Sequence, residues 1–200
     1  MFSTIFLFEI KRWFKQPVFY VYLLAFGLIA YFAAISALGA FDSLAGTTSD
    51  PIYYNSPINV ARFINSLSTL LYFLLPTIVG ASIYRDYLYK VHTVLYSYPL
   101  RKLDYLAGKF MASLLIVSLI CLACLIAFYV ASLHPTVNPT RVGPHYFKAY
   151  LHAFLIVVLP NFLLFGSIIF ALITFTRNVY IGFVFVLILF LLQADRKSVV

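Results

Sequence analysis

Three features of this chain could take part in nucleotide binding, redox chemistry or metal binding. They are a glycine-lysine pair, two cysteines and four histidines. The pair Gly108-Lys109 suggests the end of a phosphate-binding loop, where backbone amides and a lysine hold nucleotide phosphates. Such a loop needs a glycine five positions before Gly108, where Leu103 stands, and Ser or Thr after the lysine, where Phe110 stands. We therefore predict no nucleotide site in this chain, so any nucleotide hydrolysis that drives it, with ATP and Mg²⁺, would need a separate subunit or domain.

The cysteines and histidines do not form reactive or metal-binding patterns. Cys121 and Cys124 lie in an apolar run, where burial disfavours the reactive thiolate, so we predict packing and not redox chemistry. His134, His145 and His152 lack the close spacing of metal ligands, and the chain has no HExxH sequence. No nucleophile stands beside a base, and no carboxylates pair, within the apolar runs. We predict no catalytic, cofactor-binding or metal-binding residue, and no enzyme activity.

The composition is that of a membrane protein. The chain is 64% hydrophobic and 10% charged, whereas soluble domains are roughly 45–50% apolar and about 25% charged. Its formal net charge of +8 comes from residues in short segments beside apolar runs and forms no basic face. The expected partner is a lipid bilayer, and nucleic acid is not expected.

The pattern of apolar runs predicts an all-α, polytopic membrane helix bundle with five spans of an expected six. Residues 1–17 precede it as an amphipathic interfacial helix that Pro17 ends. The transmembrane domain covers 18–194, and its spans are predicted at 18–38, 61–83, 110–132, 150–175 and 179–193. Pro76 is expected to kink the second span, while Pro160 and Asn161 are a break and an amide that could line a pathway.

The distribution of lysine and arginine predicts the orientation. The amino-terminal segment holds three, the segment 84–109 five and the turn at Arg177 one. The other side holds three: Arg62, Arg141 and Lys148. Because cytoplasmic segments are enriched in these residues, the amino terminus is predicted inside and 84–109 is predicted to be a cytoplasmic loop.

The loop 84–109 contains a distinctive order of short motifs: a basic-acidic pair, a threonine, a leucine-rich turn ending in Ser-x-Pro, and a glycine-lysine pair. They are Arg85-Asp86, Thr93, Leu95-x-Ser97-x-Pro99 and Gly108-Lys109. In this order they resemble the first cytoplasmic loop of type-2 ABC transporter permeases, although His92 stands where that family usually has glycine. The likeness extends to the amino-terminal helix, which contains Glu9 and ends in a basic-x-Pro sequence at Lys15 to Pro17.

The resemblance implies a permease subunit of an ATP-driven exporter in the bacterial cytoplasmic (inner) membrane. Its partners would be an ATP-binding cassette ATPase subunit and a second permease bundle, as a homodimer or a heterodimer. The ATPase would act through the 84–109 loop, which in this family meets that subunit. The expected contact or hinge residues are Arg85, Asp86, Thr93, Leu95, Ser97, Pro99, Gly108 and Lys109.

Other readings of the sequence stay open. One is a non-transporting membrane scaffold or assembly protein whose cytoplasmic loop binds a partner. Another is the amino-terminal part of a permease fused to an extracytoplasmic zinc aminopeptidase-like domain, because the aromatic-rich sequence resembles that long subgroup. The residues 195–200 match the translation of a common short-read sequencing adapter, so we expect the natural chain to depart from this sequence after residue 194.

Overall fold

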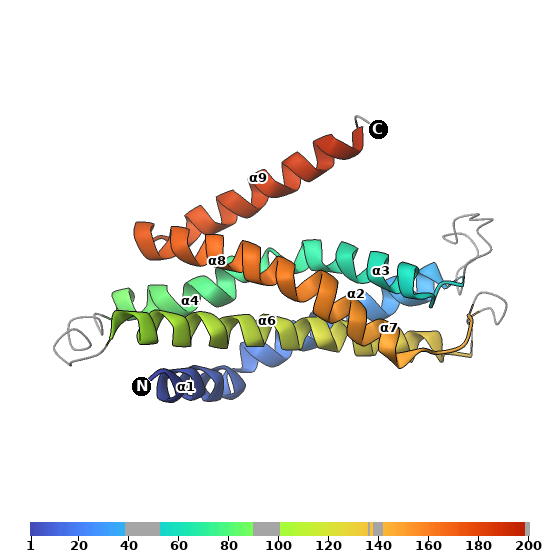
Figure 1. Cartoon of the computed structure of the whole chain (residues 1–200), viewed down its shortest axis with the longest axis horizontal. Coiled ribbons are helices and arrows are strands. Elements are labelled where there is room, and N and C mark those ends of the chain that lie inside the picture. The colour runs from blue at the N-terminus through green and yellow to red at the C-terminus, as the bar shows by residue number, and fades with distance from the viewer. Residues whose placement is uncertain (39–52, 90–100, 136, 138–141, 199–200) are drawn as a thin grey trace. The chain divides into compact units, whose positions relative to one another are not determined.

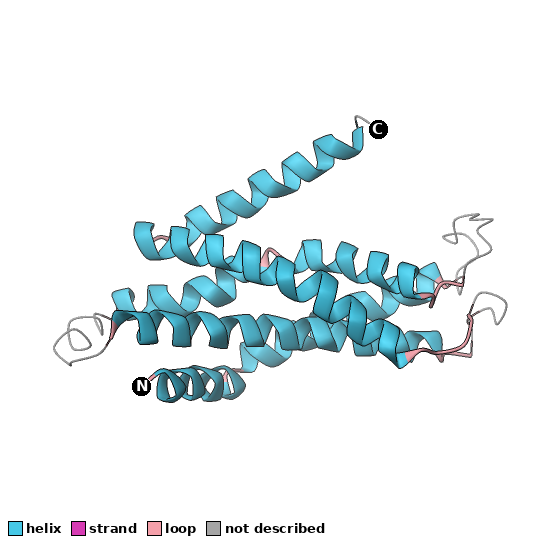
Figure 2. Ribbon diagram, in the orientation of Figure 1, coloured by secondary structure: helices cyan, strands magenta, loops and turns pink. Residues whose placement is uncertain are grey.

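The computed structural model describes residues 1–38, 53–89, 101–135, 137 and 142–198, and within these every regular element is a helix (Figure 2). The all-α prediction is confirmed for this part of the chain. In chain order (Figure 1), the helices are α1 (Phe2–Lys15), α2 (Pro17–Ala37), α3 (Pro57–Leu71), α4 (Leu74–Leu88), α6 (Lys102–Ser132), α7 (Phe147–His152), the π-helix η2 (Ala153–Val158), α8 (Leu159–Thr176) and α9 (Val179–Ser198).

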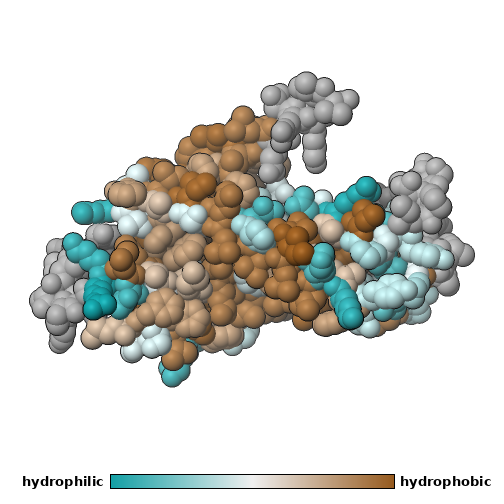
Figure 3. Space-filling view, in the orientation of Figure 1, coloured by the Kyte–Doolittle hydropathy of each residue, from teal (hydrophilic) through white to brown (hydrophobic). Residues whose placement is uncertain are grey.

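Three helical segments are long and apolar enough to cross a membrane: α2, α6 and the continuous run of α7, η2 and α8. The bent pair of α3 and α4 adds a fourth when it is counted as one span. The apolar part of α9, Val179–Leu192, is shorter. The described residues therefore form a helical protein with three or four candidate spans, where the sequence predicted five of six. The surface along the helices is largely apolar on the face drawn in Figure 3.

The junction of α1 and α2 follows from Pro17. The residue before a proline is pushed toward extended backbone, and Gln16 has φ −90° and ψ 126°, so α1 ends at Lys15. Pro17 then opens α2, because the first position of a helix needs no amide donor.

A kink was predicted at Pro76, and the structure has a bend of 43° at the break between α3 and α4, shortly before Pro76. Around Tyr72 and Phe73 the backbone closes shorter, 3₁₀-type hydrogen bonds, from Phe73 N–H to Leu70 O and from Leu75 N–H to Tyr72 O, both 3.2 Å. Pro76 is buried in the first turn of α4, where its missing N–H leaves no helical bond unmade.

Pro160 has a different effect, because the helix before it widens into η2. Proline lacks an amide donor and its ring clashes with the carbonyl four residues earlier, that of Ile156. The preceding turn is instead a π-helix, in which the Leu159 N–H bonds to Phe154 O. Pro160 is exposed and Asn161 is half-buried.

The third long helix, α6, begins at Lys102 and not at the predicted position 110. Asp104 lies in its first turn, where the helix dipole favours negative charge, and the Tyr105 N–H bonds to Arg101 O at 3.2 Å. Polar residues thus extend the helix beyond the apolar stretch. The cytoplasmic segment predicted at 84–109, with a short amphipathic helix before Pro99 and a second helix start at Leu103 to Tyr105, is helical at both ends, with 84–88 in α4 and 102–109 in α6.

The chain divides into two compact units. The first contains Met1–Gln16, Thr69–Ser118 and Asn161–Val200, and the second contains Pro17–Ser68 and Leu119–Pro160. In the first unit α9 packs on α4, and a Cβ at Gly80 would lie 2.9 Å from Ile173 Cδ1. In the second unit the buried Asn55 side chain donates to Gly143 O at 2.6 Å and accepts from Gly143 N–H at 2.8 Å. This paired bond joins the segment before α3 to the segment before α7.

Candidate functional site

A group of charged and polar residues meets in the first unit, and we call it the Lys109 cluster. Its members are Glu9, Ser82, Asp86, Tyr105 and Lys109. Glu9, Ser82 and Lys109 are buried. The Lys109 side chain is 4% exposed. Its ammonium donates to Ser82 O at 2.5 Å, forms an ion pair with the Asp86 carboxylate and lies 3.3 Å from Glu9 Oε1. One cation of α6 therefore holds a backbone carbonyl and a carboxylate of α4 and a second carboxylate of α1.

Glu9 lies at the centre of the buried side of α1. It is 2% exposed, and the other buried residue of this helix is Trp13, one turn later. Arg12 Nη1 lies 3.9 Å from Glu9 Oε1. The second carboxylate oxygen of Glu9 has no hydrogen-bond partner among the described residues. A carboxylate in this position depends on Lys109, because an unpaired buried charge is expensive.

Asp86 is the acceptor at which α4 and α6 meet. It accepts from the Lys109 ammonium and from the Tyr105 hydroxyl. The same ammonium lies 4.9 Å from the centre of the Tyr105 ring, within the range of a cation–π contact. Tyr105 thus interacts with both charges of the pair and fixes their positions.

Arg85 extends the charged region toward α1. Its Nε donates to Ala81 O at 2.8 Å, and its guanidinium carbon lies 5.6 Å from the centre of the Trp13 ring. Within the described residues, the Trp13 indole N–H and one terminal nitrogen of Arg85 are buried without a hydrogen-bond partner. The contact between them is therefore stacking and electrostatic in character.

Gly108 allows α1 to approach α6 closely. A Cβ added at Gly108 would lie 3.2 Å from Ile5 Cγ2 and 3.3 Å from the Phe2 carbonyl oxygen. The second atom belongs to the backbone and cannot move without moving α1. Glycine at this position brings the amino-terminal helix near enough for Glu9 to reach Lys109.

The predicted coupling residues fall into two groups. Arg85, Asp86, Gly108 and Lys109 come together at the contact of α1, α4 and α6. The other four, Thr93, Leu95, Ser97 and Pro99, lie outside the described residues. The kink residues Pro76, Pro160 and Asn161 are elsewhere in the chain and are not part of the Lys109 cluster.

Sequence reasoning did not single out Glu9, Ser82, Trp13 or Tyr105 as site residues. A signal for Glu9 was present, since it is the one acidic residue before Asp42 in the sequence and it stands in a mostly apolar helix. Ser82 contributes only its backbone carbonyl to Lys109, so no pattern of side chains would have identified it.

The chemistry of the cluster is that of a contact between helices. It offers carboxylates, an ammonium and a phenol that are already bonded to one another. No group of three or more His, Cys, Asp or Glu residues that could hold a metal ion occurs in the described part of the chain. The sequence matches no protein-family model, no curated protein and no solved structure.

Proposed function

We propose that this chain is the membrane-spanning subunit of an ATP-driven exporter of the ABC type, and that a separate ATPase drives it through the segment between α4 and α6. The observation that carries the proposal is the position of Lys109. It bonds α6 to α4 and α1 beside the two helix ends that flank residues 90–100. The motifs Arg85-Asp86 and Gly108-Lys109 also support it, because they occur in the order of the family loop that meets the ATPase.

The cluster suggests how a displacement of residues 90–100 would be transmitted to α1. A partner that displaces residues 90–100 displaces the end of α4 and the start of α6. Since Lys109 is bonded to Asp86 and to Glu9, α1 moves with them unless a buried ion pair is broken. The three helix ends therefore respond together.

The last turn of α4 offers a surface for such a partner. Leu88 and Tyr89 are 58% and 70% exposed, next to the segment 90–100. Exposed aromatic and aliphatic residues beside charged ones are common at protein interfaces. In the proposed arrangement these residues face the cytoplasm of a bacterium, on the same side as the amino terminus. Six spans form each bundle, and a second bundle completes the exporter.

The proposal is tested by substitutions in the segment between α4 and α6 that should uncouple the ATPase from the chain and still allow the chain to insert into the membrane. We expect Leu95→Ala/Pro99→Ala to abolish stimulation of the partner ATPase in proteoliposomes while the chain still inserts. The matched control is Leu133→Ala/Pro135→Ala, exposed residues at the other end of α6, which should leave stimulation unchanged. Normal stimulation and transport in the Leu95/Pro99 variant would contradict the proposed coupling site, and a chain that stimulates no ATPase in any form would favour a scaffold.

A further inference from the structure

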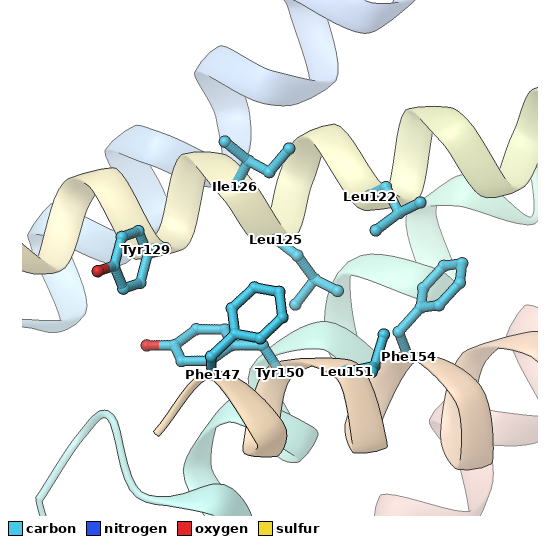
Figure 4. A pocket seen from close by; sticks show the side chains of 8 residues that line it. All are labelled: Leu122, Leu125, Ile126, Tyr129, Phe147, Tyr150, Leu151 and Phe154. Carbon is cyan, nitrogen blue, oxygen red and sulfur yellow. The ribbon is translucent and has the colours of Figure 1, made fainter. Parts of the chain in front are cut away.

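A groove in the second unit runs between α6 and the pair α7 and η2 (Figure 4). It has a volume of about 220 Å³. Leu122, Leu125 and Tyr129 line it from α6, while Tyr150, Leu151 and Phe154 line it from α7 and η2. Apart from the two tyrosine hydroxyls, these side chains are wholly apolar.

The groove opens on a surface that would face lipid. Both of its walls belong to candidate membrane spans, and Ile126 and Leu151 at its edge are 62% and 46% exposed. From Leu122 to Tyr129, and from Phe147 to Phe154, seven residues of helix extend about 10 Å at 1.5 Å per residue. The groove therefore follows the direction of the spans for roughly a third of the ~30 Å hydrocarbon core.

The shape and lining of the groove indicate what can occupy it. The groove runs along two neighbouring helical segments, is lined by apolar side chains and has a volume of about 220 Å³. An extended, narrow apolar chain matches this shape and this chemistry.

One end of the groove is polar. Tyr129 and Tyr150 lie within a turn of the ends of α6 and α7, their ring centres are 5.8 Å apart, and Figure 4 shows both hydroxyls at the same end. Tyr150 is 5% exposed, and its hydroxyl has no hydrogen-bond partner among the described residues. The Ser132 hydroxyl lies near it and donates to Tyr129 O at 2.7 Å. The Tyr150 phenol can thus donate to an oxygen from outside the chain, and tyrosines near the ends of spans commonly lie at the level of the lipid headgroups.

The π-helix η2 explains why a groove exists here. A π turn is wider than an α turn and interrupts the regular ridges by which helices interlock. Phe154 belongs to η2, and Pro160 causes the widening.

The geometry points to a binding site for one acyl chain of a membrane phospholipid, with the Tyr150 hydroxyl donating to an oxygen of its ester region. The site depends on the chain lying in a membrane and not on the proposed transport function. The apolar chain lies between Leu125 and Phe154, and the headgroup remains at the membrane surface beside Tyr129.

The test uses the full chain in vesicles of phosphatidylethanolamine and phosphatidylglycerol that contain a phospholipid with a photoreactive diazirine in its acyl chain. Labelled residues are mapped by mass spectrometry. We expect Ile126 and Leu151 to be labelled several-fold more than Leu191 and Leu187 of α9, which are similarly exposed at 66% and 49%. Equal labelling of α9 and the groove would overturn the proposal.

Two variants sharpen the test. Leu125→Trp fills the groove and should remove the enrichment, whereas Leu164→Trp, at a 54% exposed position of α8, should not. Tyr150→Phe keeps the shape and removes the donor, so enrichment should fall about fivefold, the value of one net hydrogen bond. Enrichment that survives Leu125→Trp would contradict an acyl-chain site, and enrichment that Tyr150→Phe leaves unchanged would contradict the hydrogen bond from Tyr150.

Discussion

Lys109 is the residue on which the charged cluster depends. It is one ammonium between two carboxylates that belong to different helices, and all three side chains are largely buried. Attraction between buried charges is offset by the loss of their hydration, so the cluster contributes more to specifying how α1 docks than to net stability. Removing the cation takes from Glu9 and Asp86 the ammonium that both contact, and leaves Glu9 with Arg12 at 3.9 Å and Asp86 with the Tyr105 hydroxyl.

We predict that Lys109→Met destabilises the docked state of α1 by about 3–5 kcal/mol, because it removes the ammonium that pairs with two largely buried carboxylates. Trp13 is the single tryptophan of the chain and is 3% exposed, so its emission reports docking directly. The emission maximum should shift to the red in Lys109→Met. The control Lys102→Met changes an exposed lysine on the same helix and should leave the emission and the unfolding free energy within about 0.5 kcal/mol of the parent.

A second set of variants tests whether charge is the cause. Glu9→Gln/Asp86→Asn/Lys109→Met removes the stranded charges together with the cation and should recover a large part of the lost stability. If the triple variant is as unstable as Lys109→Met, packing by the lysine side chain, and not its charge, holds the helices.

Sequence reasoning reached part of the cluster at the residue scale. Asp86 and Lys109 stand in motifs, so they could be selected. Glu9 could not be assigned to the cluster, because its partner is remote in sequence and ion pairing across helices leaves no local pattern. The structure places it at the centre of the buried side of α1.

At the scale of elements, the contact of α1 with α6 depends on Gly108. We predict that Gly108→Val displaces α1, since even a Cβ would come within 3.3 Å of the Phe2 backbone oxygen. Quenching of Trp13 by iodide should increase in this variant. Ala107→Val adds a similar volume at the neighbouring, exposed position and should leave the quenching unchanged. Unchanged quenching in Gly108→Val would mean that α1 does not need this close approach.

Prolines made the element boundaries partly predictable. Pro17 separates α1 from α2, as expected from its effect on the preceding residue. The sequence predicted a break at Pro160 but not the π-helix before it. A proline can kink a helix or widen it, and packing decides which hydrogen bonds form. α6 begins before the predicted span 110–132, close to the helix start predicted at Leu103 to Tyr105, because a helix continues readily past the apolar stretch into polar residues such as Lys102 and Asp104.

At the scale of the whole molecule, sequence and structure agree on a helical membrane protein and differ in the number of spans. Length and hydropathy identify α2, α6 and the run from α7 to α8 as candidate spans. The pair α3 and α4 is interrupted, and the apolar part of α9 is short, so the five-span count and the orientation stay predictions.

The orientation is open to a direct test with a membrane-impermeant maleimide. The native Cys121 and Cys124 are buried and should not react. We expect a cysteine at Ser3, which is exposed, to be labelled only after the membrane is permeabilised, and a cysteine at Tyr146, which is 59% exposed, to be labelled in intact cells. The reverse pattern would place the amino terminus outside and exclude a cytoplasmic Lys109 cluster.

Docking of an ATPase beside the ends of α4 and α6 can be measured by site-specific photocross-linking in native membranes. A photoreactive phenylalanine analogue replaces Tyr89, which is 70% exposed at the end of α4, and in a second protein replaces Tyr146 as the control. We expect that Tyr89 alone cross-links to a protein with a Walker-type nucleotide site, identified by mass spectrometry. If the cross-links from Tyr89 contain no such protein, or if Tyr146 cross-links to it equally, no ATPase docks at this place.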